Sequence, residues 1–241
     1  MTESLWNGRK RIDFDFDGRE AILVIPDKPR DDNAFVFRAE FFDAFPYADI
    51  KLLEMGFYIA YVNNSNRFGS PGAVDVMYNF HNYLTNVYGL NEKCVLFGFS
   101  RGGLYASNYA AKHPEKVSVL YLDAPVLNIL SWPYGFGSGA GSAPDVEFFE
   151  KETGVNCHTV LSYRDNPIDK IDILLKNNIP IVTVCGLKDA VVPFSENMEI
   201  FEKKYREGGG NIKLITKPDC GHHPHSLENP EEIINFILGV I

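Results

Sequence analysis

Patterns that would place the chain in a cofactor-dependent or redox class are missing. Its 241 residues hold four cysteines and no C-x-x-C pair, so neither a zinc knuckle nor a thioredoxin-like redox centre is supported. Neither the G-x-x-x-x-G-K-[ST] phosphate loop nor the G-x-G-x-x-G dinucleotide turn occurs. We therefore expect free thiols, no cofactor and no metal.

Basic charge is in deficit and long apolar runs are absent. The net charge of -9 and the pI near 5.2 disfavour a nucleic-acid partner and an anionic membrane surface. No apolar run approaches the roughly eighteen residues of a membrane span, and the first twenty residues hold no signal-peptide core. We expect a cytoplasmic protein with no membrane partner, and the oligomeric state stays open.

Short apolar strands alternate with amphipathic helices along most of the chain. Alternation at Ile12, Phe14 and Phe16, followed by Asp17-Gly18, predicts an antiparallel opening pair completed by residues 21–25. The later strands are predicted at 57–63, 93–99, 117–123, 180–186 and 211–217, and the helices at 73–87, 101–112, 195–205 and from 230. This order predicts one α/β domain over residues 1–241, whose mainly parallel sheet carries helices on both faces.

One segment interrupts this alternation. Residues 124–179, after the sixth strand of the expected fold, far exceed an ordinary loop, which predicts a small helical insertion. Ligands of open α/β sheets bind outside the carboxyl ends of the strands, so the insertion is placed to act as a lid, with a mobile linker as the alternative. Trp132 and Tyr134 within it could stack on a substrate or pack the insertion itself.

Gly98-Phe99-Ser100-Arg101-Gly102 fits G-x-S-x-G, a strand-to-helix turn that exposes a serine hydroxyl. A helix N-cap is the ordinary alternative role for such a serine. A serine nucleophile needs a histidine base and a carboxylate that orients this base, so these partners must also be present. The short pattern alone does not decide the role of Ser100.

Both partners follow late predicted strands. Asp189 comes just after the apolar run IPIVTVCG, and two adjacent histidines, His222 and His223, come just after NIKLITK. Asp123, at the end of an earlier strand, is a rival for the acid, because the carboxylate need only reach the imidazole. The pattern favours Ser100, Asp189 and one of the two histidines as a catalytic triad.

The choice between the histidines depends on their neighbours. A glycine before His222 lets the loop turn the imidazole back toward the serine, whereas Pro224 biases His223 to an extended conformation that points its side chain elsewhere. We therefore predict His222 as the base. Together with His225, the two histidines could suggest a metal site. However, Pro224 breaks helical spacing and no second ligand cluster is evident, so no metal is predicted.

The chain order Ser, Asp, His is that of α/β-hydrolases. Through GFSRGG, GLKDAVVP and CGHHPHSLENP the chain resembles this superfamily over nearly its whole length. Within the superfamily it is similar to bacterial esterases related to prolyl-oligopeptidase-type serine hydrolases. The resemblance implies a serine esterase that cleaves a small-molecule ester through an acyl-enzyme without a cofactor, and the aromatic residues of the insertion suggest acylated carbohydrates or phenolic esters.

Two other functions remain open. A small serine peptidase fits the subgroup, although 241 residues leave no room for the propeller domain of the larger peptidases. A non-catalytic binding protein on a hydrolase scaffold is the second, because a fold does not by itself determine a function.

The oxyanion hole should use the backbone N–H of Arg101 and one N–H from the loop after an early strand. The H-G-G-G pattern of lipases does not occur after AILVIP. We expect the second donor near Phe35 or Val36.

Three phenylalanines follow this position at intervals of four. Phe37, Phe41 and Phe45 predict one buried face of a helix. Arg38 is offset from that face, where it could bind an acidic or hydroxyl-rich substrate or lie in solvent as a surface arginine.

Overall fold

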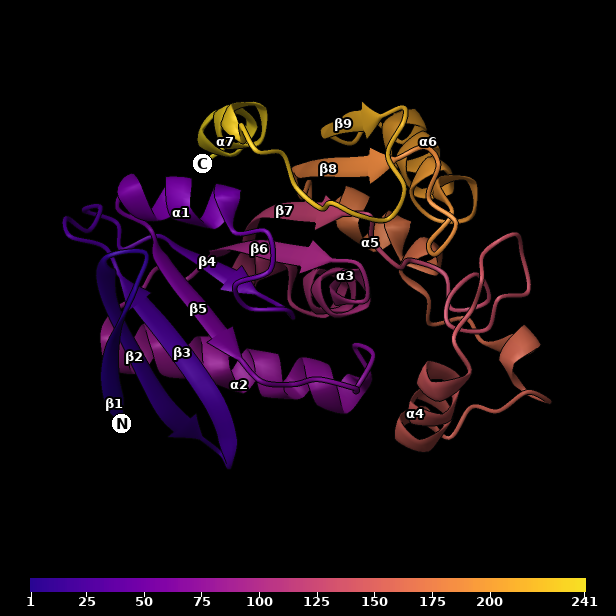
Figure 1. Cartoon of the computed structure of the whole chain (residues 1–241), viewed down its shortest axis with the longest axis horizontal. Coiled ribbons are helices and arrows are strands. Elements are labelled where there is room, and N and C mark those ends of the chain that lie inside the picture. Colours follow the sequence, from indigo (N-terminus) through magenta and orange to yellow (C-terminus); the bar gives the residue numbers. More distant parts are fainter.

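The computed structural model describes residues 1–241, and its centre is a nine-stranded sheet in the order β1-β2-β3-β5-β4-β6-β7-β8-β9 (Figure 1). The first four strands in this order pair antiparallel, and all neighbours from β5 through β4 to β9 pair parallel. The strands are β1 (Thr2–Trp6), β2 (Arg9–Phe16), β3 (Arg19–Ile25), β4 (Phe35–Arg38), β5 (Tyr58–Val62), β6 (Cys94–Phe99), β7 (Val117–Asp123), β8 (Ile181–Gly186) and β9 (Ile212–Lys217).

Helices cover both faces of this sheet. They are α1 (Tyr47–Glu54), α2 (Pro71–Tyr88), α3 (Gly102–Lys112), α4 (Ala143–Thr153), α5 (Ile171–Lys176), α6 (Met198–Glu207) and α7 (Glu231–Leu238). Buried side chains of α1 and α7 share one core with the sheet, and those of α2, α3, α5 and α6 share a larger core on the other face. Strand residues alternate between the two cores because side chains of a strand point to opposite faces in turn. The predicted α/β-hydrolase architecture is confirmed.

Two strands lie where the sequence pattern predicted none. β1 precedes the expected opening pair, and β4 occupies the segment interpreted as the start of a helix. Phe37 lies within β4, whereas Phe41 and Phe45 follow it in irregular backbone with φ values of +56° and +49°. The helical face is therefore wrong. A four-residue strand buried on both faces reads as an apolar run rather than as an alternation.

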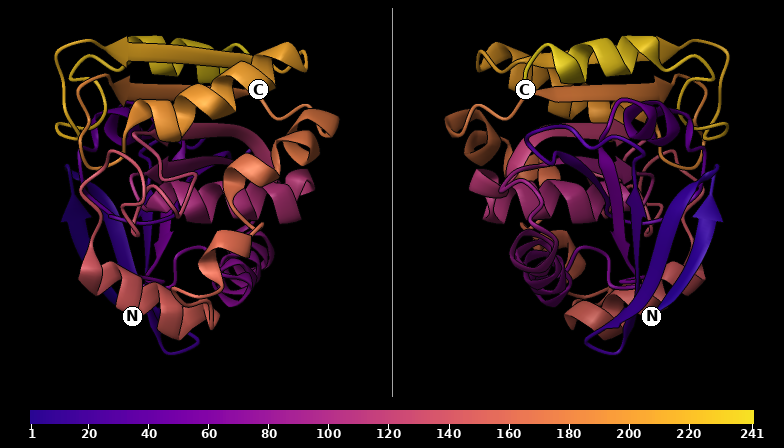
Figure 2. Two further views of the ribbon diagram at one scale, coloured as in Figure 1. Left: turned by 90° about the vertical axis from the view of Figure 1, so that its right-hand side faces the viewer. Right: turned by 90° about the vertical axis from the view of Figure 1, so that its left-hand side faces the viewer.

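The insertion begins after β7, the seventh strand of the structure rather than the sixth. It contains α4 and α5 together with short 3-10 turns at Val160–Ser162 and Pro167–Asp169. α5 contacts α3 and α6 and so belongs to the layer on the sheet. α4 lies at the side of the molecule away from α7 and β9 (Figures 1 and 2). Motion of this segment as a lid stays a prediction. None of the helices combines the length and the apolar character that a bilayer crossing requires.

A buried histidine joins α2 to α3. The Nδ1 atom of His81 lies 2.9 Å from the Tyr109 hydroxyl, and its Nε2 lies 3.2 Å from the carbonyl oxygen of Glu92. Burial, assisted by the charge of Lys116, lowers the pKa of His81 to about 4, against an ordinary value of 6.5. Between these two values the unfolded chain binds more protons at this position than the folded chain does. The free energy of unfolding therefore falls as the pH is lowered through this window.

The variant His81→Gln should remove this pH dependence, because its amide can donate to the Glu92 carbonyl and accept from Tyr109 without titrating. Between pH 7 and pH 4, we expect the wild type to lose up to about 3 kcal/mol more unfolding free energy than the variant. Urea unfolding at each pH measures the difference. The same loss in both proteins would contradict the assignment of a neutral buried imidazole.

Candidate active site

Ser100 lies in the turn between β6 and α3 with a φ of +50°, in the left-handed region that non-glycine residues rarely adopt. Its N–H donates to the carbonyl of Asp123 at 2.8 Å, and its own carbonyl accepts from the N–H groups of Gly103 and Val126 at 2.9 Å each. The bonds to Asp123 and Val126 hold the turn against the end of β7 and the residues after it, and the bond from Gly103 closes the turn itself. Strain of this kind persists where surrounding structure over-determines the conformation.

Glycines make the close approach at this turn possible. A Cβ at Gly98 would lie 2.6 Å from the Cβ of Ala106, and one at Gly103 would lie 2.5 Å from the Cβ of Pro125. Both distances are far below van der Waals contact. The first and last glycines of GFSRGG, Gly98 and Gly103, are thus explained by packing of the strand, the helix and the segment after β7.

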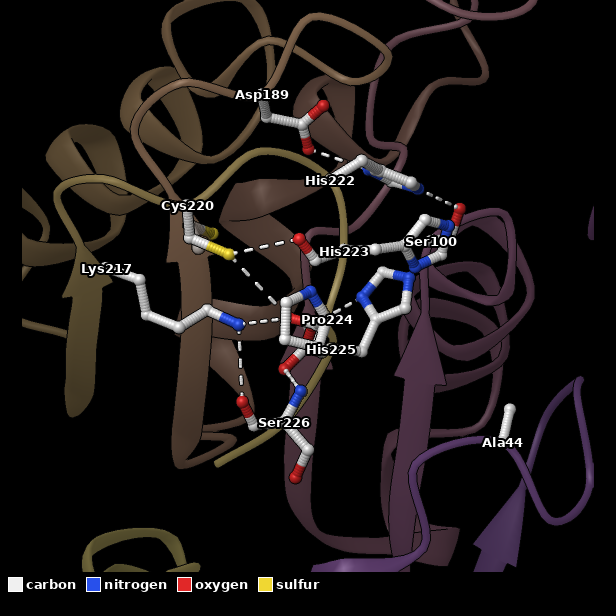
Figure 3. A network of polar contacts seen from close by, with 12 residues as sticks. Ala44, Ser100, Asp189, Lys217, Cys220, His222, His223, Pro224, His225 and Ser226 are labelled. Carbon is white, nitrogen blue, oxygen red and sulfur yellow. Dashed lines mark hydrogen bonds and ion pairs between the residues drawn. The ribbon is translucent and has the colours of Figure 1, made fainter. Parts of the chain in front are cut away.

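The three predicted triad residues meet at the carboxyl ends of β6, β8 and β9 (Figure 3). The Oγ of Ser100 lies 2.9 Å from Nε2 of His222, and Nδ1 of His222 lies 2.7 Å from Oδ2 of Asp189. The histidine and aspartate side chains are 8% and 3% exposed. The second oxygen of Asp189 accepts the N–H groups of Val191 and Val192, each at 2.8 Å, which fixes the carboxylate.

Asp123, the rival acid, binds a different histidine. Its Oδ1 lies 2.7 Å from Nδ1 of His225, and its Oδ2 accepts the N–H of Ser226 at 2.8 Å and the Tyr121 hydroxyl at 3.1 Å. All of these groups are buried. Asp123 therefore anchors the loop that carries the histidines, instead of orienting His222.

His223 lies beside the triad without a polar partner for its ring. It is exposed, it stacks on Phe45 with ring centroids 5.8 Å apart, and its centroid is 5.0 Å from that of His222. Partial burial, followed by repulsion from His225 and His222, lowers the pKa of His223. The geometry separates the two adjacent histidines as the loop sequence predicted.

Neither Phe35 nor Val36 is free to act as the second oxyanion donor that the sequence predicted. Phe35 and Val36 are fully buried within β4 and pair in register with β5, so their backbone groups belong to the sheet. β4 runs toward the site. Beyond its end, the N–H groups of Glu40 and Phe41 are the first that donate to no acceptor in the protein. The N–H of Arg101 is free in the same way. Glu40 lies against the start of α3, since a Cβ at Gly102 would be 3.8 Å from its backbone nitrogen.

The Arg101 side chain forms a network that sequence reasoning did not find. Its guanidinium binds Glu40 at 2.6 and 2.9 Å, Asn66 at 3.0 Å and Asp145 of α4 at 3.1 Å. Burial raises the pKa of Glu40, although the hydrogen bonds and the positive charge of Arg101 act to lower it. Burial alone would lower the pKa of Arg101, but its bonds to Glu40 raise it. No sequence pattern pairs residues 61 positions apart; only the basic residue within G-x-S-x-G hints at an acidic partner.

Arg38 occupies neither of the positions expected for it. It is 1% exposed and binds both carboxylate oxygens of Asp49 in α1 at 2.8 Å, with its guanidinium 4.1 Å from the ring centroid of Phe99. A substrate-binding or solvated arginine is therefore excluded by burial. The side chain joins α1 to the sheet.

The aromatic residues of the insertion are packing residues. Trp132 is 9% exposed and stacks on Phe68, and the hydroxyl of Tyr134 donates to Glu150 at 3.1 Å while its ring packs on Phe149. They lie within or against the larger core. The alternative that these side chains pack the insertion is the correct one.

A serine elbow, an imidazole and a buried carboxylate at the ends of parallel strands define an α/β-hydrolase of the serine type. The model of the prolyl oligopeptidase family matches residues 45–239, and the chain belongs to this family. It is 24% identical to the acylamino-acid-releasing enzyme of Mus musculus over 255 aligned positions, which cover 94% of this chain and 33% of the mouse enzyme. The chain thus spans about a third of the length of this curated relative.

Solved structures show the same fold. A candidate dipeptidyl aminopeptidase IV from Bacteroides ovatus has a TM-score of 0.72 at 12% identity, over 96% of this chain and 35% of that one. MPT51 (FbpC1) of Mycobacterium tuberculosis has a TM-score of 0.66 at 16% identity, over 93% and 94% of the two chains. At these identities the likeness concerns the fold alone.

The two aspartates predict a ranked pair of variants. Asp189→Asn should lower the turnover of p-nitrophenyl acetate by at least about 10³-fold, because it removes the charge and the tautomer control behind His222. Asp123→Asn should cost less than about tenfold beyond its effect on thermal stability, because it acts on His225. Initial rates and melting curves of both proteins test this. The reverse ranking would transfer the acid to Asp123.

Proposed function

We propose that this chain hydrolyses carboxylic esters through an acyl-enzyme formed on Ser100. The observation that carries the proposal is the continuous relay from the Ser100 hydroxyl through both nitrogens of His222 to Asp189, with distances of 2.9 and 2.7 Å. An unaided serine hydroxyl is a weak nucleophile near neutral pH, and an adjacent base with an orienting carboxylate activates it.

The reaction follows from this arrangement. Ser100 Oγ attacks the acyl carbon while its proton moves to Nε2 of His222, and Asp189 stabilises the imidazolium formed. The N–H of Arg101 and an N–H of the Glu40–Phe41 loop support the developing oxyanion. Collapse expels the alcohol, which takes the proton from Nε2. A water molecule then repeats the sequence on the acyl-enzyme and releases the acid and the free serine hydroxyl.

Cleavage of a peptide bond in a short N-acylated peptide, which releases an acylamino acid, is a second candidate, favoured by family membership and by the relative named for releasing acylamino acids. The chemistry of the relay is the same for esters and amides. We prefer esters because an alcohol is a better leaving group than an amine, so an ester requires less assistance from the enzyme. The packing positions of Trp132 and Tyr134 give no support for a carbohydrate or phenolic substrate.

A matched pair of substrates separates these functions. N-acetylalanine p-nitrophenyl ester and N-acetylalanine p-nitroanilide share the acyl group and differ in the bond cleaved. We expect rapid release of p-nitrophenol from the ester and no enzymatic release of p-nitroaniline, with a pre-steady-state burst that marks the acyl-enzyme.

The variant Ser100→Ala should abolish the ester activity, whereas Ser162→Ala, which changes an exposed serine of the insertion, should retain it. Cleavage of both substrates at comparable rates would favour the peptidase. Retained ester hydrolysis in Ser100→Ala would refute the proposed nucleophile.

A further inference from the structure

Three imidazoles converge beside the serine, and only one of them serves the relay (Figure 3). One ring nitrogen each of His222, His223 and His225 lies within 4.8 Å of the other two. The ring centroids are 4.7 to 5.0 Å apart. These residues come from one short loop, so they form a local group that we call the histidine cluster.

Two members of the histidine cluster are already held as metal ligands usually are. Nδ1 of His222 lies 2.7 Å from Asp189, and Nδ1 of His225 lies 2.7 Å from Asp123. A histidine that gives its Nδ1 proton to a carboxylate presents an unprotonated Nε2, and this carboxylate–histidine pairing recurs behind metal-bound imidazoles. The ring of His225 makes no other hydrogen bond, and the ring of His223 makes none.

Charge and geometry indicate the kind of ion. Three imidazoles, two of them hydrogen-bonded to buried carboxylates, complement a divalent cation. Imidazole nitrogen suits Zn²⁺ and its transition-metal neighbours rather than Mg²⁺ or Ca²⁺. Zinc bonds of about 2.0–2.1 Å require nitrogens about 3.3–3.4 Å apart in a tetrahedral site. The nitrogens, which lie within 4.8 Å of one another, must therefore approach by up to about 1.5 Å, and the exposed position of His223 leaves its ring room to move.

We propose that the histidine cluster is an inhibitory site for Zn²⁺ or a similar imidazole-binding metal ion. The ion binds the lone pair of His222 Nε2, which is the atom that must accept the serine proton. Ser100 then keeps its proton and the relay stops. This inference goes beyond the proposed function, because it concerns the binding of a metal ion as well as its effect on hydrolysis.

Titration with zinc in a metal-buffered assay tests the effect. We expect Zn²⁺ to inhibit p-nitrophenyl acetate hydrolysis, EDTA to restore it, and Mg²⁺ at the same concentration to have no effect. His223→Ala should raise the half-inhibiting zinc concentration at least tenfold, each variant being compared with its own zinc-free rate. His225→Gln, whose amide can still donate to Asp123, should do the same.

Two controls distinguish this site from other ligands. His158→Ala removes an exposed histidine of the insertion, and Cys220→Ser removes a thiol whose Sγ lies 3.3 Å from the His223 carbonyl oxygen. Both should keep the wild-type half-inhibiting concentration. Loss of inhibition in Cys220→Ser, or unchanged inhibition in His223→Ala and His225→Gln, would overturn the proposal.

Calorimetric titration of the full chain with Zn²⁺ gives a readout that needs no hydrolysis. We expect one zinc ion per chain, bound at least tenfold more weakly by His222→Ala and by His223→Ala. Binding that persists unchanged in both variants places the ion elsewhere and refutes the site. If the chain hydrolyses no ester, the calorimetric titration still tests the metal site, so the two proposals can fail separately.

Discussion

The end of β7 holds both halves of the candidate active site through a single residue, Asp123. The backbone carbonyl of Asp123 binds the N–H of Ser100 in its strained turn, and the carboxylate of the same residue binds His225 and Ser226 in the loop that carries His222. Ser100 and His222 come from segments 122 positions apart, yet both are positioned from one strand end. A buried carboxylate with three hydrogen-bond donors is costly to leave unpaired, so this anchor resists movement.

A second anchor joins the oxyanion loop to the insertion. Arg101 directly follows the nucleophile, and its guanidinium holds Glu40 beyond β4 and Asp145 in α4. The Glu40 side chain is fully buried, and removal of one partner from such a pair costs several kcal/mol because the other charge remains uncompensated. The residue whose N–H we propose as an oxyanion donor therefore also fixes the loop of the second proposed donor, through its side chain.

The features that sequence reasoning predicted are local ones. The apolar strands before Ser100, Asp189 and His222 are short runs with clear ends, and parallel strands bring their carboxyl ends to one edge. β4 was missed because four residues carry too little periodicity. The pairs of Arg38 with Asp49 and of Arg101 with Glu40 depend on tertiary folding across β4, α1 and α3, and the convergence of three histidines depends on how one loop turns around Pro224. Patterns along the chain do not encode such contacts.

Ser100 is proposed as an activated nucleophile, and the alternative is a turn residue of a binding protein. The most direct measurement is covalent labelling with a fluorophosphonate, followed by peptide mapping in a mass spectrometer. An activated Ser100 should give one label per chain, located on Ser100, formed rapidly in the wild type, much more slowly in His222→Ala and not at all in Ser100→Ala. A wild-type chain that stays unlabelled, or a label on another serine, would contradict it.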